Sequence, residues 1–228
     1  LKTDGKKGYE GTITVPFSPE TENSGIEEGF VLECGEKLVY SRKIVLEQAL
    51  LQGHTVLHFG AVDSACEVFW NGVRVGGHEG GFTAFSIDVT QFARLGENEI
   101  CVECTDEATR NGFTRGKQSD RRGGIWYTAQ SGIWQTVYLE AASDLRLDYV
   151  HVTPDINRGL ASVEILLNRI PDREVTLSLD VQLGGKKIRK VTASTVNRNV
   201  VISTPYFPFK ILVNIVCRCM SGYDNHIL

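Results

Sequence analysis

The sequence has 228 residues and a formal net charge of −4, with 42% hydrophobic and 23% charged residues, which is the balance of a globular protein that buries a core. The negative charge argues against binding to nucleic acid or to an anionic membrane surface. No run of about 18 apolar residues occurs, and the first eight residues lack the apolar segment of a signal peptide, so we expect no membrane contact.

Apolar and polar residues alternate with a period of two along the first 140 residues, and no window of helical length has an apolar stripe with a period of 3.6. The expected strands are residues 38–46, 55–59, 66–70, 73–75, 84–88, 99–104 and 133–139. Asn71 and Gly72 separate two of these strands, and this pair readily adopts the positive φ angles of a type I′ hairpin turn. Seven strands of this kind predict a β-sandwich.

Residues 105–130 interrupt the alternation with a long segment that contains four glycines. Among its charged residues are Arg110, Arg115, Lys117, Arg121 and Arg122 against Glu107 and Asp120. Long loops in compact domains are often functional, whereas scattered charge is typical of a solvated flap. Both interpretations stay open on this pattern alone.

A second set of expected strands begins after residues 141–144. These strands are residues 145–152, 161–167, 175–183, 187–195, 200–203 and 211–217, with a hairpin turn at Gly184-Gly185. We therefore place a domain boundary between residues 142 and 143. The second domain, residues 143–228, is expected to be a small immunoglobulin-like β-sandwich.

Neither the cysteines nor the histidines have the spacing of a zinc site. They are Cys34, Cys66, Cys101, Cys104, Cys217 and Cys219, and His54, His58, His78, His151 and His226. Cys101 and Cys104 lie in an expected strand, which would direct them to opposite faces. We expect structural cysteines in a reducing, cytoplasmic setting, a structural role for His78 in the turn at 76–81, and no metal or other cofactor.

Several ordered motifs occur along the chain: residues 57–63, 68–72 and 78–90, the segment Arg115-Gly116-Lys117-Gln118, and residues 124–140. Together they resemble the sugar-binding domain of glycoside hydrolase family 2, the family of β-galactosidases and β-glucuronidases. The resemblance is specific over residues 11–153, and residues 154–203 match in strand pattern. It implies an all-β fold in which a jelly-roll β-sandwich (galactose-binding-like), residues 1–142, is followed by the immunoglobulin-like domain.

In this family a third domain, an (α/β)-barrel, carries the two catalytic glutamates. Nothing in this sequence alternates strand and helix over the ~250 residues that a barrel needs, so no catalytic residues are expected here. The resemblance then implies a non-catalytic front part of an enzyme that hydrolyses β-linked O-glycosyl bonds in carbohydrate metabolism, with a carbohydrate substrate and the barrel as partners. The alternative is a free-standing carbohydrate-binding or adhesion module. We also expect self-association into a homo-oligomer through exposed apolar surface.

Four residues of the long loop are candidates for contact with substrate, because aromatic rings stack on sugar rings while amides and charges bind hydroxyls. They are Trp126, Tyr127, Gln118 and Lys117. Many relatives have a sugar-contacting aspartate six residues before the Gly132-Ile133 pair, and this position is Trp126 here. The alternative role for Trp126, Tyr127 and Trp134 is packing in the sandwich core or in an interface.

Overall fold

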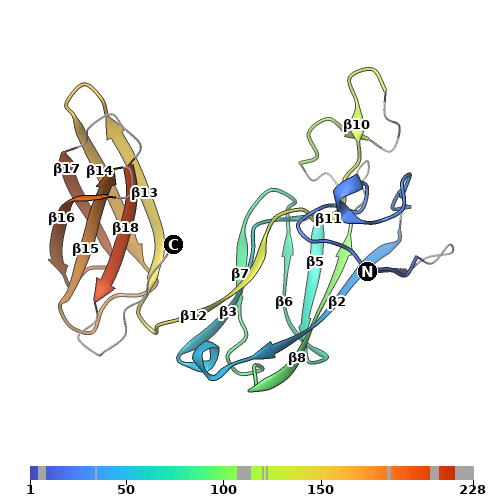
Figure 1. Ribbon diagram of the computed structural model, residues 1–228, viewed down its shortest axis with the longest axis horizontal. Coiled ribbons are helices and arrows are strands. Elements are labelled where there is room, and N and C mark those ends of the chain that lie inside the picture. The colour runs from blue at the N-terminus through green and yellow to red at the C-terminus, as the bar shows by residue number, and fades with distance from the viewer. Residues whose placement is uncertain are drawn as a thin grey trace. The chain divides into compact units, whose positions relative to one another are not determined.

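The structure is a computed structural model whose chain divides into two compact units, Leu1–Ala141 and Ala142–Leu228 (Figure 1). It describes residues 1–4, 9–33, 35–106, 114–119, 121, 123–183, 186–205 and, as backbone, 211–218; the side chains of residues 183 and 188 are also not described. Cys34, Glu107, Arg110, Asp120, Arg122, Gly184, Gly185, Cys219 and His226 lie outside the described residues. Within the described part, no helix has the length and apolar character needed to cross a membrane.

The larger sheet of the first unit has five antiparallel strands in the order β1-β2-β8-β5-β6. Their bounds are β1 (Lys2–Asp4), β2 (Lys37–Leu46), β8 (Gly96–Thr105), β5 (Ala65–Trp70) and β6 (Val73–Glu79). Strands β2 and β8 pair over ten residues, from Lys37 opposite Thr105 to Leu46 opposite Gly96. The turn between β5 and β6 is confirmed as a hairpin with positive φ at both central residues, 50° at Asn71 and 81° at Gly72.

The second layer of this unit is a sheet in the order β12-β3-β7. Its strands are β12 (Val137–Ala142), β3 (His54–Phe59) and β7 (Phe85–Asp88), and two short 3₁₀ turns, η1 (Glu22–Ser24) and η2 (Gln48–Leu51), lie in the connections. The expectation of one strand over residues 133–139 is wrong. This segment is divided between β11 (Gly132–Ile133), which pairs with β4 (Val62–Asp63), and β12, because the chain exchanges one pairing partner for another at residues 134–136.

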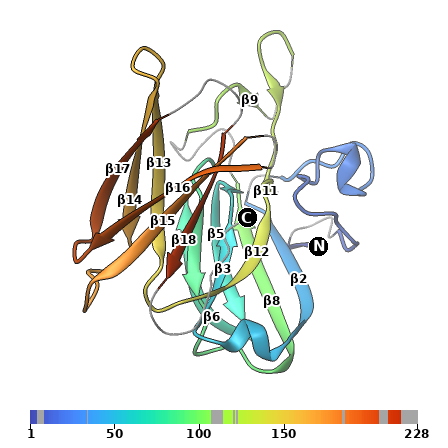
Figure 2. The ribbon, with the colours of Figure 1, turned by 60° about the vertical axis from the view of Figure 1, so that its left-hand side comes forward.

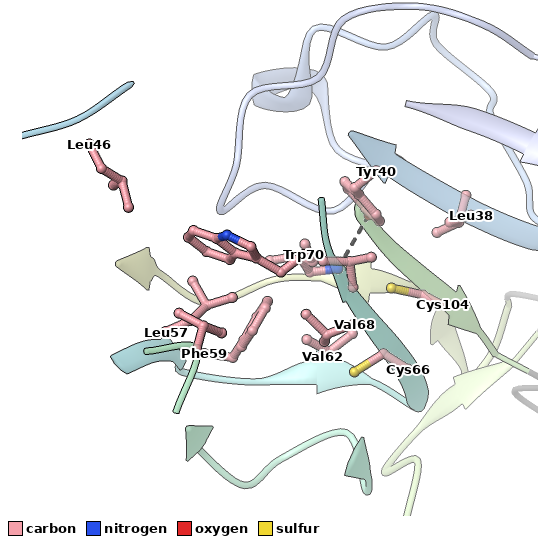
Figure 3. Packing of buried hydrophobic residues seen from close by; sticks show 13 residues of the cluster. Leu38, Tyr40, Leu46, Leu57, Phe59, Val62, Cys66, Val68, Trp70 and Cys104 are labelled. Atoms are coloured by element: carbon pink, nitrogen blue, oxygen red, sulfur yellow. Dashed lines mark hydrogen bonds between the residues drawn. The ribbon is translucent and has the colours of Figure 1, made fainter. Parts of the chain in front are cut away.

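The two layers enclose one apolar core, to which the inward positions of β2, β3, β5 and β8 contribute. Figure 3 shows Trp70, Phe59 and Leu57 packed together inside it. The Trp70 indole N–H is satisfied by the Asn98 side-chain oxygen at 3.1 Å. The dashed line in Figure 3 marks a second polar anchor, in which the Ile133 amide donates to the Tyr40 hydroxyl at 3.2 Å. This bond attaches β11, and the loop before it, to the sandwich.

The second unit contains two three-stranded sheets, whose layers are visible in Figure 2. One has the order β13 (Leu147–Asp155), β14 (Leu160–Leu167), β17 (Asn199–Pro205), and the other β16 (Lys186–Thr195), β15 (Val175–Leu183), β18 (Ile211–Arg218). Alternate residues of β14 and β15, among them Val163, Ile165, Leu177 and Leu179, are fully buried in a shared core. The all-β sandwich class is thus confirmed, whereas the immunoglobulin-like assignment and the domain boundary at residue 142 stay predictions.

Candidate functional site

The four predicted substrate-contact residues lie on one loop, residues 114–131, at one end of the first unit (Figures 1 and 2). Two short strands organise it: β9 (Gln118–Ser119) runs parallel to β10 (Tyr127–Thr128), with Tyr127 opposite Gln118. The Tyr127 amide donates to the Lys117 carbonyl at 2.8 Å. Pairing of the backbone therefore brings Lys117, Gln118 and Tyr127 next to each other.

A tight turn at the loop tip presents the aromatic side chains. Gly123 and Trp126 exchange two backbone hydrogen bonds, each 3.1 Å long. The two glycines at the start of this turn have φ angles of 137° and 62°, a backbone conformation that residues with a Cβ rarely adopt. The glycines that the sequence shows at this point are thus required for the turn that carries Trp126.

The rings at this tip face solvent. Trp126 is 40% exposed and Tyr127 is 67% exposed, and neither belongs to the buried core of the unit. This exposure contradicts packing of these two residues in the sandwich core, while the alternative of packing in an interface stays a prediction. The Arg115 guanidinium carbon lies 5.6 Å from the centroid of the Trp126 ring, a distance typical of a cation–π contact. Lys117 is also exposed.

Gln118 lies at the base of the loop, and both ends of its amide are bound within the protein. Its Nε2 donates to Asp63 Oδ2 at 3.2 Å, and its Oε1 accepts the Gln130 amide at 2.6 Å. This side chain connects both ends of the loop to the end of β4. Gln118 is therefore placed to hold the loop in position. The side chains of Trp126, Tyr127 and Lys117 face solvent.

Asp63 anchors that connection from the sandwich side. Asp63 is only 6% exposed, and this burial raises the pKa of its carboxyl. The hydrogen bond from Gln118 partly offsets the rise. Gly81 packs against the same carboxylate so closely that an added Cβ would overlap Asp63 Oδ1. The Gly81 carbonyl in turn accepts a hydrogen bond from the Trp134 indole N–H at 2.8 Å. A glycine at position 81 is thus needed for this packing.

A second carboxylate, that of a half-buried glutamate which sequence reasoning did not single out, holds the other end of the loop. Glu20 accepts two hydrogen bonds from Ser131, one from its amide to Oε2 at 3.1 Å and one from its hydroxyl to Oε1. Burial raises the pKa of Glu20 to about 7, with a smaller contribution in the same direction from the charge of Asp106. The only sequence signal was its place within residues 11–153, over which the family resemblance is specific.

His78 has the structural role that was expected of it. Its Nε2 lies 2.9 Å from the Thr83 hydroxyl, and its ring stacks on Phe85 at 4.3 Å between centroids. Among the described residues, no group of three or more His, Cys, Asp or Glu side chains could hold a metal ion. The loop and the carboxylates beneath it form a candidate binding surface.

Comparison with known sequences places residues 13–141 in the family described as "Glycosyl hydrolases family 2, sugar binding domain". The chain is 30% identical over 130 residues to a β-galactosidase of Halalkalibacterium halodurans, a match that covers 53% of this chain and 11% of that protein. It is 25% identical over 150 residues to a β-galactosidase of Thermoanaerobacter pseudethanolicus, covering 64% and 18%. The chain therefore spans less than a fifth of the length of these relatives.

Two solved structures with a similar fold extend the comparison to both units. The β-glucuronidase of Ruminococcus gnavus has a TM-score of 0.64 at 17% identity, covering 93% of this chain and 38% of that chain. The β-D-mannosidase of Dictyoglomus thermophilum has a TM-score of 0.62 at 17% identity, covering 84% and 29%. At this level of identity the likeness establishes a shared fold.

Proposed function

This chain belongs to glycosyl hydrolase family 2 through its sugar-binding domain, and from that membership we propose that it is the non-catalytic N-terminal part of a glycosidase. The parent enzyme hydrolyses β-linked O-glycosyl bonds of a carbohydrate substrate. This part frames the substrate site and braces a catalytic barrel. The matches to β-galactosidases, of which the chain covers only a small part, support this division of labour.

The carboxylates of the loop region support a non-catalytic role. A retaining glycosidase needs one carboxylic acid and one carboxylate about 5–5.5 Å apart, both directed at the scissile bond. Here Asp63 is bound to Gln118 and Glu20 is bound to Ser131, so each carboxylate holds a segment of the loop. Both carboxylates are thus engaged in holding the loop, in keeping with a bracing role.

One observation carries the assignment of the loop to substrate contact: the Trp126 ring is 40% exposed at the tip of a loop whose base is anchored by buried groups. Exposing an indole to water is unfavourable, and a rigid base lowers the entropy cost of binding. The apolar face of a pyranose ring can cover such a side chain, while Tyr127 and Lys117 bind hydroxyl groups. Gln118 contributes by holding this surface in place.

The test is Trp126→Ala in the full-length parent enzyme. We expect kcat/KM to fall at least about tenfold, which corresponds to ~1.4 kcal/mol of lost transition-state binding, with a melting temperature close to that of the wild type. Ile125→Ala is the matched control, because Ile125 is 65% exposed in the same turn. If Trp126→Ala instead melts much lower and its folded fraction keeps normal kinetics, Trp126 is a packing residue and the assignment is wrong.

Two simpler observations separate the proposal from a free-standing carbohydrate-binding module. The isolated chain should not hydrolyse nitrophenyl β-galactoside or nitrophenyl β-glucuronide, and turnover there would contradict a non-catalytic role. If the DNA that follows the codon for Leu228 encodes, in the same reading frame, a barrel domain with an Asn-Glu pair, this supports the glycosidase proposal. A stop codon at that point supports the module.

A further inference from the structure

Two cysteines of the first unit lie directly opposite each other on neighbouring strands. Cys66 on β5 is the register partner of Cys104 on β8. Cys66 is 6% exposed and Cys104 is 0% exposed, and both belong to the core between the two layers. Figure 3 shows both side chains among the buried residues of this core. The two thiols therefore share one face of the sheet.

The hydrogen-bond pattern of the sheet identifies the kind of pair that these cysteines form. The Asn71 amide donates to the Glu99 carbonyl at 2.8 Å, which makes these two opposite residues a hydrogen-bonded pair. Bonded and non-bonded pairs alternate along antiparallel strands, and Cys66 is five residues before Asn71. Cys66 and Cys104 are therefore a non-hydrogen-bonded pair, with an expected Cα separation of about 4.5 Å. A disulfide needs a separation of about 4.4–6.8 Å.

We propose that Cys66 and Cys104 are a disulfide site, which closes when the chain folds in the presence of a low-molecular-weight disulfide such as oxidised glutathione. The Cys66 thiolate attacks one sulfur of the oxidant, which gives a mixed disulfide and releases one glutathione thiolate. The Cys104 thiolate then attacks the Cys66 sulfur and releases the second glutathione thiolate. The two cysteines lose two electrons to the oxidant, and the two protons from the cysteine thiols pass to the glutathione thiolates.

The remaining described thiol near this pair cannot compete for it. Cys101 is on β8 as well, but it is three residues from Cys104 and its side chain therefore projects from the other face of the sheet. Its register partners are Phe69 and Ser41 rather than a cysteine. The geometry thus selects one partner for Cys66.

Burial determines when the bond can form. It raises the pKa of Cys66 to about 11 and that of Cys104 further above its ordinary value, where the charge of an ionised Cys66 adds to the effect. Few thiolates are then present in the folded chain at neutral pH, and the oxidant has little access to them. The bond should form readily during folding and slowly in the folded protein.

The position of the pair connects it to the candidate site. Thr105 follows Cys104, and its carbonyl accepts a hydrogen bond from the Ser64 amide at 3.3 Å. Ser64 in turn follows Asp63, which holds Gln118 and the substrate-facing loop. A covalent link between β5 and β8 at this point would keep the strand ends beneath the loop together.

The experiment compares two samples of the protein. One is refolded in a mixture of oxidised and reduced glutathione, and the other is refolded with a reductant alone. Free thiols are alkylated, and cleavage after glutamate separates Cys66, in residues 48–67, from Cys101, in 100–103, and Cys104, in 104–107. Mass spectrometry should find residues 48–67 linked to 104–107 in wild type and in Cys101→Ser, but not in Cys104→Ser. Linked wild type should melt cooperatively, and reduction should lower its melting temperature by roughly 5–10 °C.

Three outcomes would overturn the proposal. The first is complete alkylation of both Cys66 and Cys104 after oxidative refolding. The second is Cys66 linked to a different cysteine. The third is a linked product without a cooperative melting transition, because the bond would then belong to a non-native state.

Discussion

Glu20→Gln should remove a pH dependence of stability that is built into the loop anchor. The pKa of Glu20 is raised from 4.5 to about 7, chiefly by burial. Between these values the unfolded chain releases the proton while the folded chain keeps it, so stability must fall as the pH rises. The two pKa values correspond to an upper bound of about 3 kcal/mol. Glutamine stays neutral and keeps one carbonyl oxygen, which can accept the Ser131 amide, while its NH2 group can donate to the Ser131 hydroxyl.

The assay is urea unfolding of the wild type and of Glu20→Gln between pH 4 and pH 8. Relative to its value at pH 4, the advantage of Glu20→Gln should grow to about 0.7 kcal/mol at pH 5 and about 3 kcal/mol above pH 7. The difference between the two proteins isolates Glu20 from other titrating groups. Asp106 faces Glu20 and helps to raise its pKa, so Asp106→Asn should reduce the advantage.

Glu22→Gln is the matched control for the loss of one carboxylate, because this exposed glutamate lies two residues away. Parallel stability curves for Glu20→Gln and the wild type would refute the reasoning. They would mean that water reaches the Glu20 carboxylate and that the loop is not held over it. A large loss of stability at every pH would show instead that the charged form is needed by Ser131.

Three further predictions concern packing and assembly. Asn98→Ala should lower the free energy of unfolding by about 2–4 kcal/mol in urea titrations, because it leaves the buried Trp70 indole N–H without its acceptor; an effect below about 0.5 kcal/mol would contradict this. Gly81→Ala should lower the melting temperature by several degrees, because the new Cβ would overlap the Asp63 carboxylate, and an unchanged melting curve would show that the loop adjusts. The chain should self-associate at micromolar concentration through exposed apolar side chains such as Tyr127, so a monodisperse monomer in light scattering would count against this.

Local sequence patterns were sufficient for most of the strands. Strand β15 alternates apolar and polar residues, and its apolar residues Val175, Leu177, Leu179 and Val181 are buried because alternate side chains of a strand point to the same face; of the polar positions, Ser178 is buried as well. The hairpin at Asn71 and Gly72 was predictable for a similar reason, since few residues adopt positive φ angles. The expectation of one strand at 133–139 failed because its pairing partners, β4 and β3, lie far away along the chain.

The sequence by itself also predicted a long, glycine-containing loop over residues 105–130 that carries Trp126 and Tyr127, because glycines act over a few residues. Only the tertiary structure decided what each side chain does there. Gln118 turns to Asp63, 55 residues away, and Glu20 binds Ser131, 111 residues away. Burial and the pKa of a carboxyl depend on which distant segments surround it, and no local pattern records this. The same dependence on strand register brings Cys66 opposite Cys104.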